Sequence, residues 1–392
     1  MRGIPDDCID SIVTDPPYEL GFMGKKWDST GIAYNVDMWR ECLRVLKPGG
    51  HLLAFGGTRT YHRIACAIED AGFEIRDQIQ WIYGSGFPKS MDISKAIDKQ
   101  AGVERASLGK IKGAVNPKGY KTDGIKQSGG AFKKEYDITA PATEEAKQWD
   151  GWGTCLKPAN EPIVLARKPL SEKTIADNVL KWGTGGINID GCRIETTDIL
   201  NGGAYAKNGS QRKEMWGEDA GNSWRRDRGL EFRQPQGRFP ANVILDEEAG
   251  KLLDEQSGIT KSVVRISEDK DNPANTYSLG RKGVTPRGHN DSGGASRFFY
   301  CAKASKKERG EGNNHPTVKP LSLIKYLITL VTPPGGICLD PFEGSGTHAL
   351  ACIDLGVDFI GFELEEEYCN IANLRIERRN NIISDFIKKR QT

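Results

Sequence analysis

The sequence predicts an α/β fold with a mostly parallel central sheet and a long irregular insert. Strand and helix patterns alternate near both ends of the 392-residue chain, and strand–helix–strand units of this spacing are typical of parallel sheets. Between about Gly84 and Gly312 the chain becomes rich in Gly, Asn, Lys and Ser, which indicates loops. Only short apolar pieces interrupt that region, at 162–166, 242–245 and 298–302.

The N-terminal elements follow from local periodicity. Residues 11–14 are a short apolar strand candidate, and residues 51–55 are a candidate for a buried strand. Alternating isoleucines predict a further strand at 74–83. Helical spacing predicts helices at 37–46 and 61–71, and glycines follow both of them.

The C-terminal elements return to regular alternation. Helices are predicted at 321–330, 347–355 and 365–380, and strands at 336–340 and 358–362. This order makes a strand–helix–strand unit, and we expect its strands to lie parallel in one sheet.

Composition indicates a soluble globular protein, with 37% hydrophobic and 28% charged residues. No apolar run approaches the ~18 residues that a membrane span needs, and no signal peptide is visible. The nine cysteines show neither a C-x-x-C pair nor zinc spacing. We therefore expect a cytoplasmic protein with free thiols, no metal and no membrane partner.

The net charge of +2 does not by itself indicate a nucleic-acid binder. A basic stretch at 223–238 nevertheless includes Arg225, Arg226 and Arg228, and such a run suits contact with phosphates. A solvated surface is the alternative interpretation, and only the rest of the chain can favour a polyanion.

One loop indicates a ligand site in the C-terminal part. The sequence D-P-F-E-G-S-G-T, from Asp340 to Thr347, lies between a predicted strand and helix, where open parallel sheets bind ligands. Glycines allow close approach of the backbone, and Glu363 ends the next strand and could accept both hydroxyls of a ribose. The spacing of Gly344, Gly346 and Ala349 also fits a dinucleotide fingerprint. S-adenosylmethionine and a nicotinamide cofactor both remain open at this point.

This loop resembles the S-adenosylmethionine site of DNA amino-methyltransferases. The resemblance implies that Asp340 approaches the methionine amino group, that Phe342 lies against the cofactor and that Glu363 takes the ribose hydroxyls. Upstream, H-P-T-V-K-P at 315–320 resembles a second family segment, which implies that Lys319 pairs with the methionine carboxylate. The implied cofactor-binding residues are Thr317, Lys319, Asp340, Pro341, Phe342, Gly344, Gly346, Thr347 and Glu363.

The motif D-P-P-Y at 15–18 resembles the catalytic motif of N6-adenine and N4-cytosine methyltransferases. An exocyclic amine is a poor nucleophile, because its lone pair is delocalised into the ring. If Asp15 and the Pro16 carbonyl accepted its two hydrogens, the lone pair could point at the sulfonium methyl group. Pro17 stiffens the turn, and Tyr18 would stack on a base flipped out of double-stranded DNA. Resembling enzymes with aspartate at the first position more often modify adenine, so the resemblance implies adenine, and cytosine stays the alternative.

The order of the two motifs matches the permuted β group of that family. The resemblance implies a Rossmann-like methyltransferase fold with the catalytic half at 1–100, a target-recognition insert at 101–297 and the cofactor half at 298–392. A segment at 160–168 resembles a returning sheet strand. The strands that end at Asp15 and Asp340 can then be central neighbours, with both motifs at one edge of the sheet.

Family members usually carry a further strand and a Gly-Asp pair before the segment that matches residues 4–11. This chain begins at Met1 and lacks that strand. We therefore expect either that the start is truncated or that other residues bind the adenine ring of the cofactor. The resemblance also implies a site-specific enzyme of the restriction–modification type and is compatible with a homodimer.

Three other functions stay open at the sequence level. A nicotinamide-dependent oxidoreductase would use the glycine loop but leaves D-P-P-Y unexplained. A non-catalytic DNA-binding module would bind duplex DNA without transferring a methyl group. The third keeps the chemistry but takes RNA or a protein amide as the acceptor, and the basic insert favours DNA.

Overall fold

The computed structural model describes the whole chain except residues 22–25, 85, 87–89, 113–134, 197–235, 262–264, 268–284, 288–291, 304–312, 316 and 392. The described residues form two compact units. One unit contains Met1–Gly84 and Asn160–Thr392, and the other contains Ser85–Ala159.

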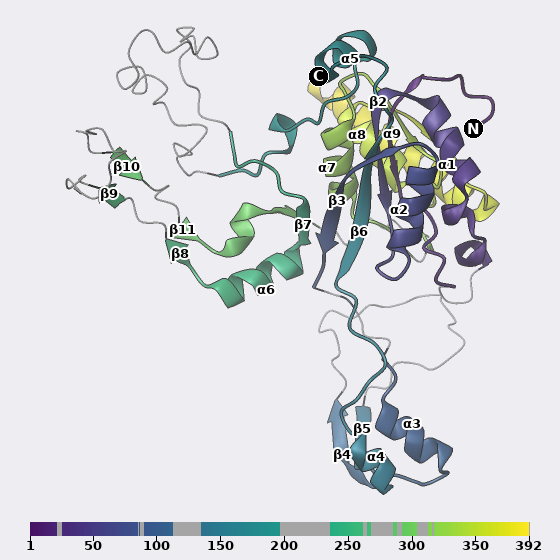
Figure 1. Ribbon diagram of the computed structural model, residues 1–392, viewed down its shortest axis with the longest axis vertical. Coiled ribbons are helices and arrows are strands. Elements are labelled where there is room, and N and C mark those ends of the chain that lie inside the picture. The colour runs from purple at the N-terminus through teal and green to yellow at the C-terminus, as the bar shows by residue number, and fades with distance from the viewer. Residues whose placement is uncertain are drawn as a thin grey trace, which may run out of the picture. The chain divides into compact units, whose positions relative to one another are not determined.

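An eight-stranded sheet forms the centre of the larger unit, in the strand order β12-β7-β3-β6-β2-β1-β13-β14 (Figure 1). Neighbouring strands run parallel except where β6 pairs with β2 and with β3, in both cases antiparallel. The mostly parallel sheet expected from the sequence is therefore confirmed. The strands are β1 (Ile9–Thr14), β2 (Leu46–Phe55), β3 (Glu74–Ile82), β6 (Asn160–Arg167), β7 (Val243–Asp246), β12 (Tyr300–Ala302), β13 (Ile337–Asp340) and β14 (Asp358–Gly361).

Helices cover both faces of this sheet. Successive residues of a strand point to opposite faces, and Ile12 and Val13 accordingly lie in two different apolar clusters. The Ile12 cluster packs against α1 (Val36–Val45) and α2 (Tyr61–Asp70), whereas the Val13 cluster packs against α7 (Leu321–Val331) and α8 (Thr347–Leu355). A long helix, α9 (Glu366–Gln391), contacts α8.

Strands β1 and β13 are direct neighbours. They pair parallel, with Ser11 opposite Cys338 and Ile12 opposite Leu339. Their carboxyl ends, at Thr14 and Asp340, therefore meet at the same edge of the sheet, as the sequence predicted. The two motifs are separated by most of the chain and yet begin side by side.

The region expected to be loops is more regular than predicted. Two of its apolar pieces become β7 and β12, which pair parallel at one end of the sheet. Two helices of this region also form within the larger unit, α5 (Ile175–Trp182) and α6 (Glu247–Ser257). The side chains of Thr174 and Asp246 accept hydrogen bonds from the first turns of these helices, and such caps stabilise the N-terminal ends of helices. Small antiparallel pairs join β8 (Thr260–Lys261) to β11 (Ser292–Gly293) and β9 (Arg265–Ser267) to β10 (Thr285–Arg287).

The smaller unit is built around one buried carboxylate. Asp98 accepts hydrogen bonds from the backbone N–H groups of Ala142 (2.9 Å) and Thr143 (3.0 Å) and pairs with Arg105 at 3.3 Å. The unit comprises α3 (Ile93–Gln100), β4 (Ser107–Lys112), β5 (Glu135–Thr139) and α4 (Glu144–Gln148). The compact units thus divide the chain differently from the three functional segments, and the functional division at 100 and 297 stays a prediction.

Candidate active site

The two motif loops are joined by a buried hydrogen bond. Thr14 donates from Oγ1 to Oδ1 of Asp340 over 2.5 Å, and the same oxygen accepts from the Phe342 N–H at 2.9 Å. Asp340 is 5% exposed. Burial and the nearby Glu343 carboxylate raise the pKa of Asp340 to about 7, against the lowering effects of His348 and of its hydrogen bonds. The cofactor loop therefore starts with a carboxyl group that titrates near neutral pH.

Asp15 belongs to a cluster of charged side chains at the end of β1. The Lys319 ammonium donates to Oδ2 of Asp15 at 2.7 Å and lies 3.1 Å from Oε2 of Glu161. Lys319 also donates to the Tyr18 hydroxyl at 3.1 Å, and that hydroxyl donates to Glu161 at 2.8 Å. Asp15, Glu161, Lys319 and Tyr18 therefore form one connected network, called the Asp15 cluster below.

The other oxygen of Asp15 is left over. Its Oδ1 is buried, and within the described parts of the chain it has no hydrogen-bond partner. An unsatisfied buried acceptor typically costs about 1–3 kcal/mol, so such atoms are informative about function. The atom is thus a buried acceptor without a donor among the described residues, in the residue that the sequence predicted to contact a base amine.

The charges in the cluster shift the titration of its members. Burial alone would lower the pKa of Lys319, but the Asp15 and Glu161 carboxylates raise it above the ordinary lysine value. Burial and the same two carboxylates raise the pKa of Tyr18 well above its usual range. Lys319 therefore stays a cation and Tyr18 stays a neutral phenol at physiological pH.

The cofactor loop is shaped by two glycines. Gly344 and Gly346 have φ values of +58° and +85°, in the left-handed region that other residues rarely adopt. A Cβ atom on Gly346 would lie 3.0 Å from the backbone of Ala372 on α9. Any other residue at this position would combine a strained φ with a tight contact to α9, and the cofactor-binding role of Gly346 stays a prediction.

Glu363 is fixed beside this loop by backbone amides. Its Oε2 accepts from the Gly344 N–H at 2.8 Å, and its Oε1 accepts from the N–H groups of Leu364 and Glu365, both at 2.9 Å. The carboxylate is half-buried. Each carboxylate oxygen can accept more than one hydrogen bond, so Oε2 keeps capacity for a hydroxyl group.

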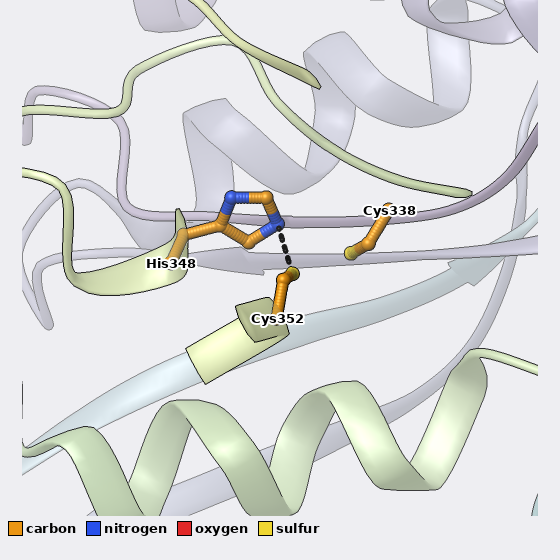
Figure 2. Close-up of side chains that lie close together, drawn as sticks. All are labelled: Cys338, His348 and Cys352. Carbon is orange, nitrogen blue, oxygen red and sulfur yellow. Dashed lines mark hydrogen bonds between the residues drawn. The ribbon is translucent and has the colours of Figure 1, made fainter. Parts of the chain in front are cut away.

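A Cys–His cluster lies on β13 and α8, the two elements that flank the loop (Figure 2). The Sγ and ring nitrogen atoms of Cys338, Cys352 and His348 lie within 4.8 Å of one another, and these residue types can bind soft metal ions. However, Nδ1 of His348 lies 3.0 Å from Oε2 of Glu343, and Nε2 lies 3.5 Å from Sγ of Cys352. Both ring nitrogens thus have protein partners, and the cluster needs no ion to account for its geometry.

Glu343 links that cluster to the cofactor loop. Its Oε1 accepts from the Ala349 N–H at 2.9 Å, in the first turn of α8, where a negative charge is favourable. Burial opposes the charged form of His348, but Cys338 and Glu343 raise its pKa well above the ordinary value. These two contacts of Glu343 fix the loop to the first turn of α8.

The segment before α7 also contacts the loop. Asn313 donates to the Ser345 hydroxyl at 3.2 Å, and Arg375 of α9 donates to the same hydroxyl at 3.0 Å. The Nδ1 of His315 lies 3.1 Å from the carbonyl oxygen of Thr317. Thr317, whose carbonyl oxygen makes this contact, is exposed.

Most of the predicted residues thus gather along one edge of the sheet, with two qualifications. Lys319 was predicted to serve the cofactor, yet in the structure its ammonium contacts Asp15, Tyr18 and Glu161. The predicted DNA-contacting arginines lie outside the described residues: Arg225, Arg226 and Arg228.

Glu161 was missed as a site residue. Sequence analysis placed it only on a returning strand, where an acidic side chain is usually solvated. The available signal was its position at the start of β6, the strand that runs opposite to its neighbours. Its first residues therefore reach the edge at which the parallel strands end.

Comparison with known proteins agrees with this geometry. A family profile described as DNA methylase, N6_N4_Mtase, matches residues 9–374. The chain belongs to this DNA methylase family. It is therefore a DNA methyltransferase that modifies an exocyclic amine of adenine or cytosine, with S-adenosylmethionine as the methyl donor.

Individual relatives are similar over different lengths. The methyltransferase is 25% identical to the type II methyltransferase M.HindIII of Haemophilus influenzae over 88% of this chain and 70% of that protein. It is 39% identical to the DNA adenine methyltransferase YhdJ of Escherichia coli over 21% of this chain and 29% of that protein. The solved PvuII DNA methyltransferase, which is cytosine-N4-specific, is 13% identical, with 97% of this chain and 86% of that chain covered and a TM-score of 0.42.

Two further observations concern the chain as a whole. All nine cysteines of the methyltransferase are free thiols. Among the described residues, no helix combines the length and the apolar composition that crossing a membrane requires.

Proposed function

We propose that the methyltransferase modifies adenine N6 in double-stranded DNA, with Asp15 and the Pro16 carbonyl accepting the two hydrogens of the target amine. The observation that carries this proposal is the buried Oδ1 of Asp15, which lacks a partner among the described residues. Hydrogen bonds from both N–H groups of the amine to these acceptors draw its nitrogen toward tetrahedral geometry, so its lone pair is no longer delocalised into the ring and can point at the methyl group.

The cofactor-binding residues fit S-adenosylmethionine by their chemistry. Asp340 offers a carboxyl group to the methionine ammonium, and Glu363 offers acceptor capacity to the ribose hydroxyls. Phe342 supplies an aromatic face to the cofactor. Gly344 and Gly346 allow the backbone of the loop to approach the cofactor closely. The cofactor supplies an electrophilic methyl group. The remaining predicted contacts, at Thr317, Pro341 and Thr347, belong to the same proposal.

The remaining residues of the D-P-P-Y motif position the nucleobase that receives the methyl group. Pro16 and Pro17 fix the turn, so the Pro16 carbonyl keeps a constant position relative to Asp15. The Tyr18 ring would stack on the flipped base. Its hydroxyl is bonded to Glu161 and Lys319, which restricts the orientation of the ring.

Adenine is proposed over cytosine on two grounds. The first motif residue is aspartate, which resembles the adenine-specific members, and YhdJ, one of the relatives, is named a DNA adenine methyltransferase. Both amines have the same N–C–N surroundings, so Asp15 and Pro16 could hold either one. Nucleoside mass spectrometry of DNA methylated in vitro tests the proposal. A dominant N4-methylcytosine peak would show that the target base is cytosine and not adenine.

The partners and setting complete the proposal. Arg225, Arg226 and Arg228 would contact the phosphates of duplex DNA within the target-recognition insert at 101–297. The free thiols suit a reducing compartment, and we place the reaction in the cytoplasm. Homodimerisation is part of the proposal as well, and sedimentation equilibrium of the purified chain tests it.

A further inference from the structure

We propose that Lys319 and Glu161 are positioning residues for the transfer step: they hold Oδ2 of Asp15 so that Oδ1 faces the target amine. This inference rests on the proposed role of Asp15 and gives Lys319 a different role from the cofactor contact expected from the sequence. Three observations support it, concerning the donors of Lys319, the placement of Glu161 and the charge of the cluster.

The ammonium group of Lys319 has no donor to spare. An ammonium carries three hydrogens, and Lys319 faces three oxygens, of Asp15 (2.7 Å), Tyr18 (3.1 Å) and Glu161 (3.1 Å). Its side chain is 9% exposed, and the ammonium also lies 4.9 Å from the centroid of the Phe55 ring. A cofactor carboxylate would have to displace one of these contacts.

The reversed direction of β6 explains why Glu161 reaches this site. Ile163 pairs with Phe55 at the end of β2, so Glu161 lies beyond that end, beside the catalytic loop. From there it accepts the Tyr18 hydroxyl at 2.8 Å and pairs with Lys319. A single carboxylate therefore fixes both the lysine that holds Asp15 and the tyrosine proposed to stack on the base.

The charge balance explains why both residues are needed. Asp15 and Glu161 are two carboxylates that share a single cation, Lys319. Without that cation the two negative charges would repel, and one carboxylate would take up a proton more readily. A protonated Asp15 has less capacity to accept from an amine. Tyr83 also faces the cluster. Burial, and to a smaller extent the Glu161 carboxylate, raise the pKa of Tyr83 to about 12, so Tyr83 adds no charge near neutral pH.

The test uses the full chain in single-turnover methyl transfer at saturating S-adenosylmethionine between pH 5 and 9. Lys319→Met should lower the plateau rate at least tenfold and move the acidic limb of the rate profile to higher pH by about one unit. Glu161→Gln should also lower the plateau but move the acidic limb to lower pH, because it removes a neighbouring negative charge. A merely structural role would not move the two limbs in opposite directions.

Cofactor affinity and controls separate the outcomes. Both variants should bind S-adenosylmethionine within about twofold of the wild-type Kd, and Lys181→Met, at an exposed lysine of α5, should match wild type throughout. A normal rate for Lys319→Met with a tenfold weaker Kd would overturn the inference and return Lys319 to the cofactor. If Lys319→Met does not fold, the limb shift of the isosteric Glu161→Gln decides. Normal turnover by Asp15→Ala would instead refute the proposed function itself.

Discussion

Thr14 and Asp340 lie 326 positions apart and share a buried hydrogen bond of 2.5 Å. The bond ties the last residue of β1 to the last residue of β13, and so ties the catalytic loop to the cofactor loop. It also favours the charged form of Asp340, the carboxyl group proposed to meet the methionine ammonium.

We expect the affinity for S-adenosylmethionine to depend on pH through Asp340. Its pKa of about 7 lies above the ordinary value for aspartate, so the carboxylate is lost as pH falls below about 7. The Kd should therefore rise between pH 7.5 and pH 6. Thr14→Val should move this rise to higher pH, because it removes a hydrogen bond to the charged form. Calorimetric titration of both proteins checks this, and superimposable Kd profiles would contradict it.

Glu363→Ala should weaken S-adenosylmethionine binding by about 1–3 kcal/mol, the range for losing hydrogen bonds to a charged group. The loss combines the proposed ribose contact with the bond that fixes the Gly344 N–H at 2.8 Å. Glu366→Ala, at an exposed acid at the start of α9, is the matched control. An unchanged Kd in a folded Glu363→Ala protein would show that this carboxylate does not bind the ribose.

Simultaneous replacement of Arg225, Arg226 and Arg228 by alanine should weaken DNA binding broadly across sequences. The slope of log K against log salt should become shallower by up to about three, one for each lost phosphate contact. Arg40→Ala, at an exposed arginine of α1 paired with Asp37, should leave the slope unchanged. If the triple variant keeps the wild-type slope, the stretch is a solvated surface.

His51 should make the fold sensitive to mild acid. Burial, with help from Arg167 and Arg76, lowers the pKa of His51 to about 4, below the unfolded value of about 6.5. The unfolded chain then binds the extra proton first, so the free energy of unfolding is fully retained above about pH 6.5. It falls by at most about 3 kcal/mol as the pH drops towards 4.

Urea unfolding of His51→Gln between pH 4 and 7 checks that window. The variant should lose stability less steeply than wild type over this range. His62→Gln, at an exposed histidine, should keep the wild-type dependence. Parallel curves for wild type and His51→Gln would mean that His51 titrates normally in the fold.

Much of this architecture could be predicted, because its strands are apolar and its motifs are short and specific. The family resemblance of the two strand-end motifs allowed β1 and β13 to be central neighbours, and the structure pairs them. Helices α5 and α6 were not predicted, although their capping residues Thr174 and Asp246 are sequence signals for a helix start. The partners of Lys319 could not be predicted either, because β6 brings Glu161 to the site only through its reversed direction in the sheet.

The central claim is that Asp15 presents an acceptor to adenine N6, and one measurement tests it most directly. Duplex DNA is incubated with isotopically labelled S-adenosylmethionine and either wild-type protein or Asp15→Ala, and its nucleosides are separated by mass spectrometry. Labelled N6-methyladenine should appear with wild type and fall at least a hundredfold with the variant, which should still bind S-adenosylmethionine. Equal N6-methyladenine from both proteins would contradict the account.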